Sequence, residues 1–196
     1  MRAHEFITEF GFSSESPKAR ITQEEIESAN IVGRIDGRDI CELSNNEVSL
    51  FFFKNETHTL TTYAVVSKQS SSDGYFRLHR IFNEEPKKGV LTALVMGIIL
   101  NLRMKLCIAT DEGLTFNGIN WICKLISAGG RGIKIVDQTG NRPNPSDLMH
   151  LWNRSFDTGE FNDTEIFLEN IDIKLHIHES KLLPPLHYYI GDERLI

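Results

Sequence analysis

The stretch Asn83–Leu94, which reads NEEPKKGVLTAL, decides the fold that this sequence predicts. Pro86 disfavours a helical conformation of Glu85, and an apolar pattern of helical period follows Gly89. The residues before this stretch, 75–82, instead alternate between polar and apolar side chains. We therefore expect a strand to end here and a largely buried helix to begin within a residue or two of Gly89.

The start of that helix is a candidate anion site. A helix N-terminus carries backbone N–H groups without intrahelical acceptors and the positive end of the helix dipole, so it can hold a phosphate. Gly89 would let a ligand approach the backbone closely. Lys87 and Lys88 add positive charge at the same place. A solvated turn before a buried helix explains the same residues, so the motif alone does not decide whether an anion binds here.

The surrounding sequence places this junction inside an α/β fold. Upstream, Thr22 and Glu25 form a capping box that predicts a helix over residues 22–32, ended by Gly33. Further elements follow from periodicity and turn residues: strands over 48–54, 60–68 and 75–82, a helix over 89–105, a strand over 106–109, a helix over 115–127, a strand over 132–136 and a helix over 144–152. Residues 166–168, 171–178 and 186–190 are further candidate strands. This order predicts a mixed sheet in which antiparallel strands precede a β-α-β-α-β unit, with helices on both faces.

Composition limits the classes of function. The chain has 21 basic and 27 acidic residues, a net charge of −6, which argues against a general nucleic-acid coat. The most apolar run, residues 90–100, is too short to span a bilayer, and residues 1–12 do not read as a signal peptide. Three unpaired cysteines, Cys41, Cys107 and Cys123, predict buried, reduced thiols. We therefore expect a soluble cytoplasmic protein without a membrane partner.

From about residue 48 to residue 136 the order of elements resembles the GNAT superfamily of N-acetyltransferases. That family carries Q/R-x-x-G-x-G/A at the corresponding junction, where Pro86, Gly89 and Leu91 stand here, so one of three positions matches. The following Thr-Ala-Leu, residues 92–94, also resembles the family. The resemblance implies acetyl-CoA or another acyl-CoA as cofactor. It implies a cofactor site formed by Phe82, Lys87, Lys88, Gly89, Val90, Leu91 and Thr92.

The same resemblance implies a candidate catalytic group near the carboxyl end of the third strand. His79 could titrate near neutrality and act as a general base. Glu84 and Asp111 are the other candidates, whereas the tyrosine acid frequent in the family has no counterpart in residues 121–125. The implied reaction is acyl transfer from acyl-CoA to an amine of a small molecule or a protein. Alternation places Arg77 and His79 on one face of the strand, so a solvated polar face is an equally good explanation.

Two segments resemble proteins of large tailed bacteriophages. Residues 110–121, TDEGLTFNGINW, are similar to GNAT-related phage proteins, although Thr115 and Trp121 would also suit a helix cap and a core position. Residues 1–9 resemble a capsid-targeting segment that is cut after Ile7-Thr8-Glu9, and an ordinary amphipathic helix is the alternative. This resemblance implies a second candidate function: a catalytically inactive GNAT-shaped protein, packaged in the phage head or bound to a host protein.

The remaining patterns carry less information. His176, His178 and Glu179 share a short segment, but two nearby histidines alone are weak evidence for a metal site, and we expect none. We expect three parts in the chain: residues 1–17 as a targeting or flexible segment, residues 18–155 as the GNAT-like domain, and residues 156–196 as an extension packed on that domain.

Overall fold

The computed structural model describes residues 22–54, 60–84, 89–109, 114–128, 132–159 and 164–171. Three predictions lie outside these ranges: the segment 1–9 that resembles a capsid-targeting segment, the candidate site residues Lys87, Lys88 and Asp111, and the segment with His176 and His178.

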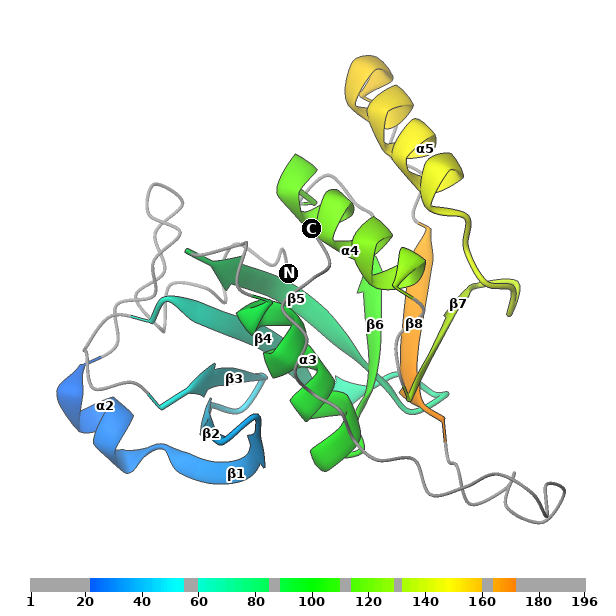
Figure 1. Ribbon diagram of the computed structural model, residues 1–196. Coiled ribbons are helices and arrows are strands. Elements are labelled where there is room, and N and C mark those ends of the chain that lie inside the picture. The colour runs from blue at the N-terminus through cyan, green and yellow to red at the C-terminus, as the bar shows by residue number, and fades with distance from the viewer. Residues whose placement is uncertain are drawn as a thin grey trace, which may run out of the picture.

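The described strands form one mixed sheet of eight strands (Figure 1). They are β1 (Asn30–Ile35), β2 (Arg38–Ser44), β3 (Val48–Phe53), β4 (Thr62–Ser70), β5 (Tyr75–Asn83), β6 (Lys105–Ala109), β7 (Ile133–Asp137) and β8 (Glu165–Asn170). Their order across the sheet is β1-β2-β3-β4-β5-β6-β8-β7. Strands β1 to β5 pair antiparallel in sequence order, β6 joins β5 in parallel, and β8 runs antiparallel between β6 and β7. The predicted α/β class with a mixed sheet is confirmed.

Four helices lie in the described ranges: α2 (Gln23–Ser28), α3 (Val90–Asn101), α4 (Phe116–Ser127) and α5 (Pro145–Thr158). Helix α2 begins at its predicted cap Thr22, and α4 and α5 also begin at predicted caps. The Thr115 hydroxyl accepts the amide N–H of Gly118, and the Asn144 side chain accepts that of Ser146. Side chains of this kind satisfy N–H groups that the helix itself leaves unpaired, so the local sequence fixes these starts.

The predicted helix over residues 22–32 is wrong beyond Ser28. Its capping box between Thr22 and Glu25 is present, but Ala29 is extended, with ψ of 135°, and β1 begins at Asn30. A hairpin of β1 and β2 follows, turning at Asp36 and Gly37, both with positive φ. An Asp-Gly pair favours this turn, and it lies beyond the predicted helix, in a stretch where no strand was predicted.

The sheet separates two clusters of buried apolar side chains. The main core lies between the sheet and helices α3, α4 and α5, with Leu94, Ile98 and Ile122 fully buried or nearly so. The second core lies on the other face of β2, β3 and β4, where Ile26 of α2 packs beside Phe52 and Tyr63. Helices therefore lie on both faces, as predicted, although α2 covers only the β2–β4 end of its face (Figure 1).

Helix α5 packs on α4 and projects from the end of the molecule (Figure 1). The Trp152 indole N–H donates to the Leu114 carbonyl over 3.0 Å, which joins α5 to the residue before the α4 cap. None of the helices in the described part of the chain has the length and apolar content needed to span a bilayer. All three cysteines are free and buried, as the sequence predicts.

Candidate functional site

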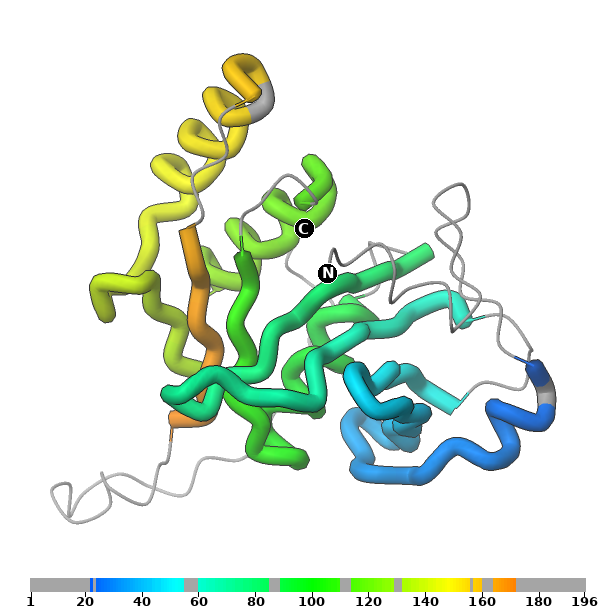
Figure 2. The backbone as a smooth tube through the Cα atoms, turned by 180° about the vertical axis from the view of Figure 1, so that it is seen from behind, coloured from blue at the N-terminus to red at the C-terminus, as the bar shows by residue number. Residues whose placement is uncertain are grey.

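The candidate site lies where β5 and β6 separate. Only three residue pairs join these strands, from Tyr75–Lys105 to Arg77–Cys107, and they run in parallel as predicted. Strand β5 continues for six residues beyond Arg77, whereas β6 ends at Ala109. Figure 2 shows the two strands diverging toward their carboxyl ends. Residues 78–83 therefore have no strand beside their β6 side within the described ranges, which leaves an extended backbone edge facing the opening.

A β-bulge sits in β5 at the same position. Val65 of β4 pairs with Arg80 and Val66 pairs with Leu78, so the register between the two strands shifts by one residue at His79. The extra residue shifts the alternation, because Leu78 lies in the main core and the next β5 residue against that core is Ile81. Bulges re-aim the strand and are frequent beside functional sites. His79 is exposed at this bulge, and Glu84 is exposed just past the strand.

Helix α3 begins directly after Gly89, as predicted. Gly89 is the N-cap residue, with φ of 65°, and as a glycine it offers no side-chain acceptor to the amides of the first turn. A Cβ added to Gly89 would meet no atom within 4 Å, so the glycine is required for its backbone conformation and not for lack of space. The arrangement leaves N–H donors at the end of the chain segment that leads from β5.

The side chains in this first turn belong to the core. Leu91 is 7% exposed and lies in the main core, and Val90 packs against it. The Thr92 hydroxyl accepts the indole N–H of Trp121 in α4 over 3.1 Å. Phe82 stacks on Tyr63, with ring centroids 5.4 Å apart, on the face of the second core. Of the predicted cofactor residues, the structure thus brings Gly89 and the α3 backbone to the opening, while Phe82, Leu91 and Thr92 have packing roles.

A second polar group, which sequence reasoning missed, crosses the sheet on the face opposite α3. Tyr75, Lys105, Glu169 and Lys134 come from β5, β6, β8 and β7 and stand side by side. Glu169 accepts the Tyr75 hydroxyl over 3.1 Å and the Lys134 ammonium over 2.8 Å, and Lys105 lies 3.4 Å away. No local motif marks this row, because its members are up to 94 residues apart in the chain.

Titration in this row follows from its contacts. Burial alone would raise the pKa of Glu169, but the hydrogen bonds from Lys134 and Tyr75 and the nearby ammonium groups hold it below its ordinary value. Burial and the bond to Glu169 raise the pKa of Tyr75 to about 12. Both groups therefore keep their usual charge at neutral pH, which identifies the row as a satisfied structural network and not a poised acid–base pair.

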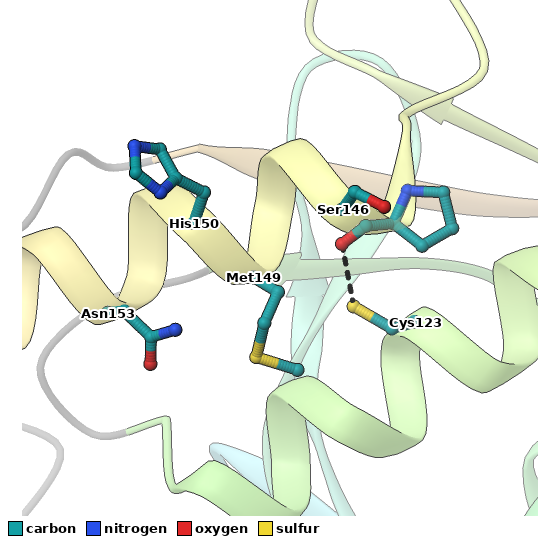
Figure 3. A pocket seen from close by; sticks show the side chains of 6 residues that line it. Cys123, Ser146, Met149, His150 and Asn153 are labelled. Carbon is teal, nitrogen blue, oxygen red and sulfur yellow. Dashed lines mark hydrogen bonds between the residues drawn. The ribbon is translucent and has the colours of Figure 1, made fainter.

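A shallow pocket lies between α4 and α5, lined by Cys123, Pro145, Ser146, Met149, His150 and Asn153 (Figure 3). The Cys123 thiol donates to the Pro145 carbonyl over 3.3 Å, and burial raises its pKa, so the thiol stays protonated. Met149 extends toward α4, whereas His150 points away from it. Within the described ranges, no three His, Cys, Asp or Glu side chains are grouped to hold a metal ion.

No protein-family model matches this chain, and no curated protein shows significant similarity to it. The function must therefore be argued from the opening between β5 and β6, where the end of the parallel pairing, a bulge and a helix start at a glycine follow one another along the described part of the chain.

Proposed function

We propose that the chain binds an acyl-CoA in the opening between β5 and β6 and transfers the acyl group to an amine. One observation carries this proposal: the parallel pairing ends at Arg77–Cys107 while β5 continues to Asn83. An extended amide chain such as the pantetheine arm of CoA can lie along a strand beyond the point where its neighbouring strand separates from it, and can bond to its main chain there. The pyrophosphate would then meet the first amides of α3, where N–H donors and the helix dipole both favour an anion.

In this proposal the cofactor supplies a thioester carbonyl, and the chain holds it and handles the proton. The amine nitrogen would form the new bond to the acyl carbon, the thioester C–S bond would break, and the amine would lose a proton. His79 at the bulge and Glu84 beyond the strand are the described side chains that could accept that proton. Asp111, the third candidate, belongs to the connection between β6 and α4, outside the described residues.

A catalytically inactive protein of similar shape is the second candidate. The sequence keeps one of three signature positions, and the strand order differs from the arrangement typical of the family. The specific observation in its favour is that helix packing already accounts for two side chains of the implied cofactor site. Leu91 lies in the core and Thr92 is bonded to Trp121. Such a protein would act by binding a phage-head or host protein.

Calorimetric titration with CoA and acetyl-CoA tests the first proposal. Gly89→Asp and Gly89→Asn form a matched pair, because both residues tolerate positive φ and they differ mainly in charge. We expect CoA to bind the wild-type chain and Gly89→Asn, and to bind Gly89→Asp at least about tenfold more weakly, because the carboxylate repels the pyrophosphate. Equal binding by both variants would place the site elsewhere. A folded wild-type chain that binds no CoA would favour the inactive protein.

Catalysis needs its own measurement. Release of free CoA thiol from acetyl-CoA would be followed with a panel of small amines and with lysine-containing peptides. Loss of turnover in His79→Ala but not in Glu84→Gln, with CoA affinity unchanged in both, would assign the base to His79. CoA binding without turnover on any amine would separate a retained binding site from a retained reaction.

A further inference from the structure

One face of the sheet carries apolar side chains that belong to neither core. On β6, β8 and β7 the residues Leu106, Leu168 and Ile135 point into the main core. Their neighbours Cys107, Phe167 and Val136 stand in one row across the opposite face, because successive residues of a strand alternate between faces. Arg77 continues the row on β5. We call this surface, together with the parallel row from Tyr75 to Lys134, the back face.

The back face has the character of a covered surface. Phe167 is half-buried and its ring packs edge-on against Tyr75, with centroids 4.8 Å apart, and Cys107 is only 7% exposed. In the view of Figure 2, no helix lies in front of β6 and β8. Helices α3 and α4 lie on the other side, and α2 packs at the β2 end of the sheet. Among the residues that the structure describes, the back face therefore has no second layer.

The chain itself continues from the edge of this face. Strand β8 ends at Asn170, and the Ile171 amide donates to the Gly132 carbonyl over 2.9 Å, beside the start of β7. Residues 172–196 follow, a length of 25 residues. Fully extended, they would reach roughly 80 Å, whereas four strands span only about 15 Å from the first to the last.

The sequence that follows has the pattern of a segment with one apolar side. Ile171, Ile173, Leu175 and Ile177 alternate with Asp172, Lys174 and His176. This period of two places the apolar residues on one side of an extended chain, which must bury them against something apolar. Further along, Leu182, Leu183, Leu186, Tyr188, Tyr189 and Ile190 provide more apolar surface.

We propose that residues 172–196 fold back over the back face, with the alternating apolar residues 173, 175 and 177 covering Cys107, Phe167 and Val136. The size of the face favours a tethered occupant. Four short strands present roughly 300 Å², well below the approximately 800 Å² per partner of a standard protein interface. A segment joined directly to β8 has an effective local concentration on the order of millimolar and needs far less contact area.

Site-specific photo-crosslinking in the full-length chain tests the proposal. A benzoylphenylalanine would replace Val136 on the back face, and in a matched control it would replace the exposed Lys124 of α4, on the opposite side of the sheet. After irradiation, proteolysis and mass spectrometry would identify the linked peptides. We expect the probe at 136 to link to a peptide from residues 172–196 of the same chain, and the probe at 124 not to do so.

Three results would overturn the proposal: no link from 136 to residues 172–196, a link to them from 124 instead, or a crosslinked dimer from 136, which would assign the face to a second copy. A probe at the exposed Lys134 repeats the experiment if the chain with a probe at 136 does not fold.

Discussion

Trp121 in α4 donates its indole N–H to the hydroxyl of Thr92 in the first turn of α3, over 3.1 Å. This bond fixes one helix to the beginning of the other, next to the opening between β5 and β6. Both side chains are partly buried, so water competes for the bond less than it would at the surface.

We expect this bond to contribute about 1 kcal/mol to the free energy of unfolding. Trp121→Phe keeps an aromatic ring without the donor, and Thr92→Val keeps the shape without the acceptor. A double-mutant cycle measured by urea unfolding separates their coupling from the packing that each substitution alters. Strictly additive effects would show that the two groups do not stabilise one another.

Gly97 should resist substitution although it lies inside a helix. An alanine there would gain about 1 kcal/mol of helix propensity, but its Cβ would collide with the Ile40 side chain and lie 3.2 Å from Ile35. We expect Gly97→Ala to lower the free energy of unfolding by about 1–3 kcal/mol in denaturant titrations.

Because the colliding atom is the terminal methyl of Ile40, Ile40→Val supplies the control for Gly97. That substitution alone should cost about 0.5–1.5 kcal/mol, yet it should make Gly97→Ala less harmful. A double variant no more stable than the sum of the single effects would rule out this steric explanation.

The ionisation of Glu169 should make the free energy of unfolding depend on pH in the acid range. Its pKa is lowered from an ordinary 4.5, so the folded chain binds this proton more weakly than the unfolded chain. The stabilisation is therefore fully present above about pH 4.5 and is lost as the pH falls through the folded pKa. We expect Glu169→Gln to cost about 1 kcal/mol at pH 7, since the side chain is only 17% exposed.

Thermal unfolding between pH 7 and pH 3 measures this effect. The difference in Tm between wild type and Glu169→Gln should shrink as the pH falls. The control is Glu47→Gln at an exposed position, and its Tm should stay close to that of wild type throughout. A difference that stays constant down to pH 3 would contradict the role given to the ionised carboxylate.

Substitutions of Gly89 should destabilise the fold through the backbone conformation at this position and not through the size of the new side chain. Its φ of 65° disfavours side chains, while space for a Cβ is open. We expect Gly89→Ala to cost about 1–2 kcal/mol and Gly89→Asn to cost less, because asparagine enters the left-handed region more readily. Equal losses in chemical denaturation would indicate that a contact, and not the backbone angle, selects glycine.

Local signals in the sequence predicted much of this fold. Thr115 and Asn144 start their helices through side-chain bonds only two or three residues away, so the sequence window contains the whole interaction. The hairpin of β3 and β4 and the parallel pairing of β5 with β6 also follow from element order. The β1–β2 hairpin was missed for two reasons: the helix predicted from the capping box at Thr22 was extended into the first half of β1, and the turn signal at Asp36 and Gly37 was not used.

The candidate site was predictable in position but not in its side chains. Gly89 precedes α3 as expected, yet the engagement of Thr92 by Trp121 depends on how two helices pack, which no local pattern reports. The row around Glu169 is a stronger case, since four strands from distant parts of the chain must pair before it exists. The bulge at His79 likewise depends on the register with β4.

The interior position of β8 constrains the order of assembly during synthesis. Strands β1 to β5 pair with their immediate predecessors, so this half of the sheet can form as the ribosome releases it. Strands β6 and β7 emerge before the strand that must lie between them. Until residues 165–170 appear, β6 keeps one exposed edge and β7 pairs with none of the described strands. Ribosome stalling or premature termination before Glu165 should therefore yield an intermediate in which β6 has an unpaired edge and β7 has not joined the sheet, the species that chaperones and proteases would meet first.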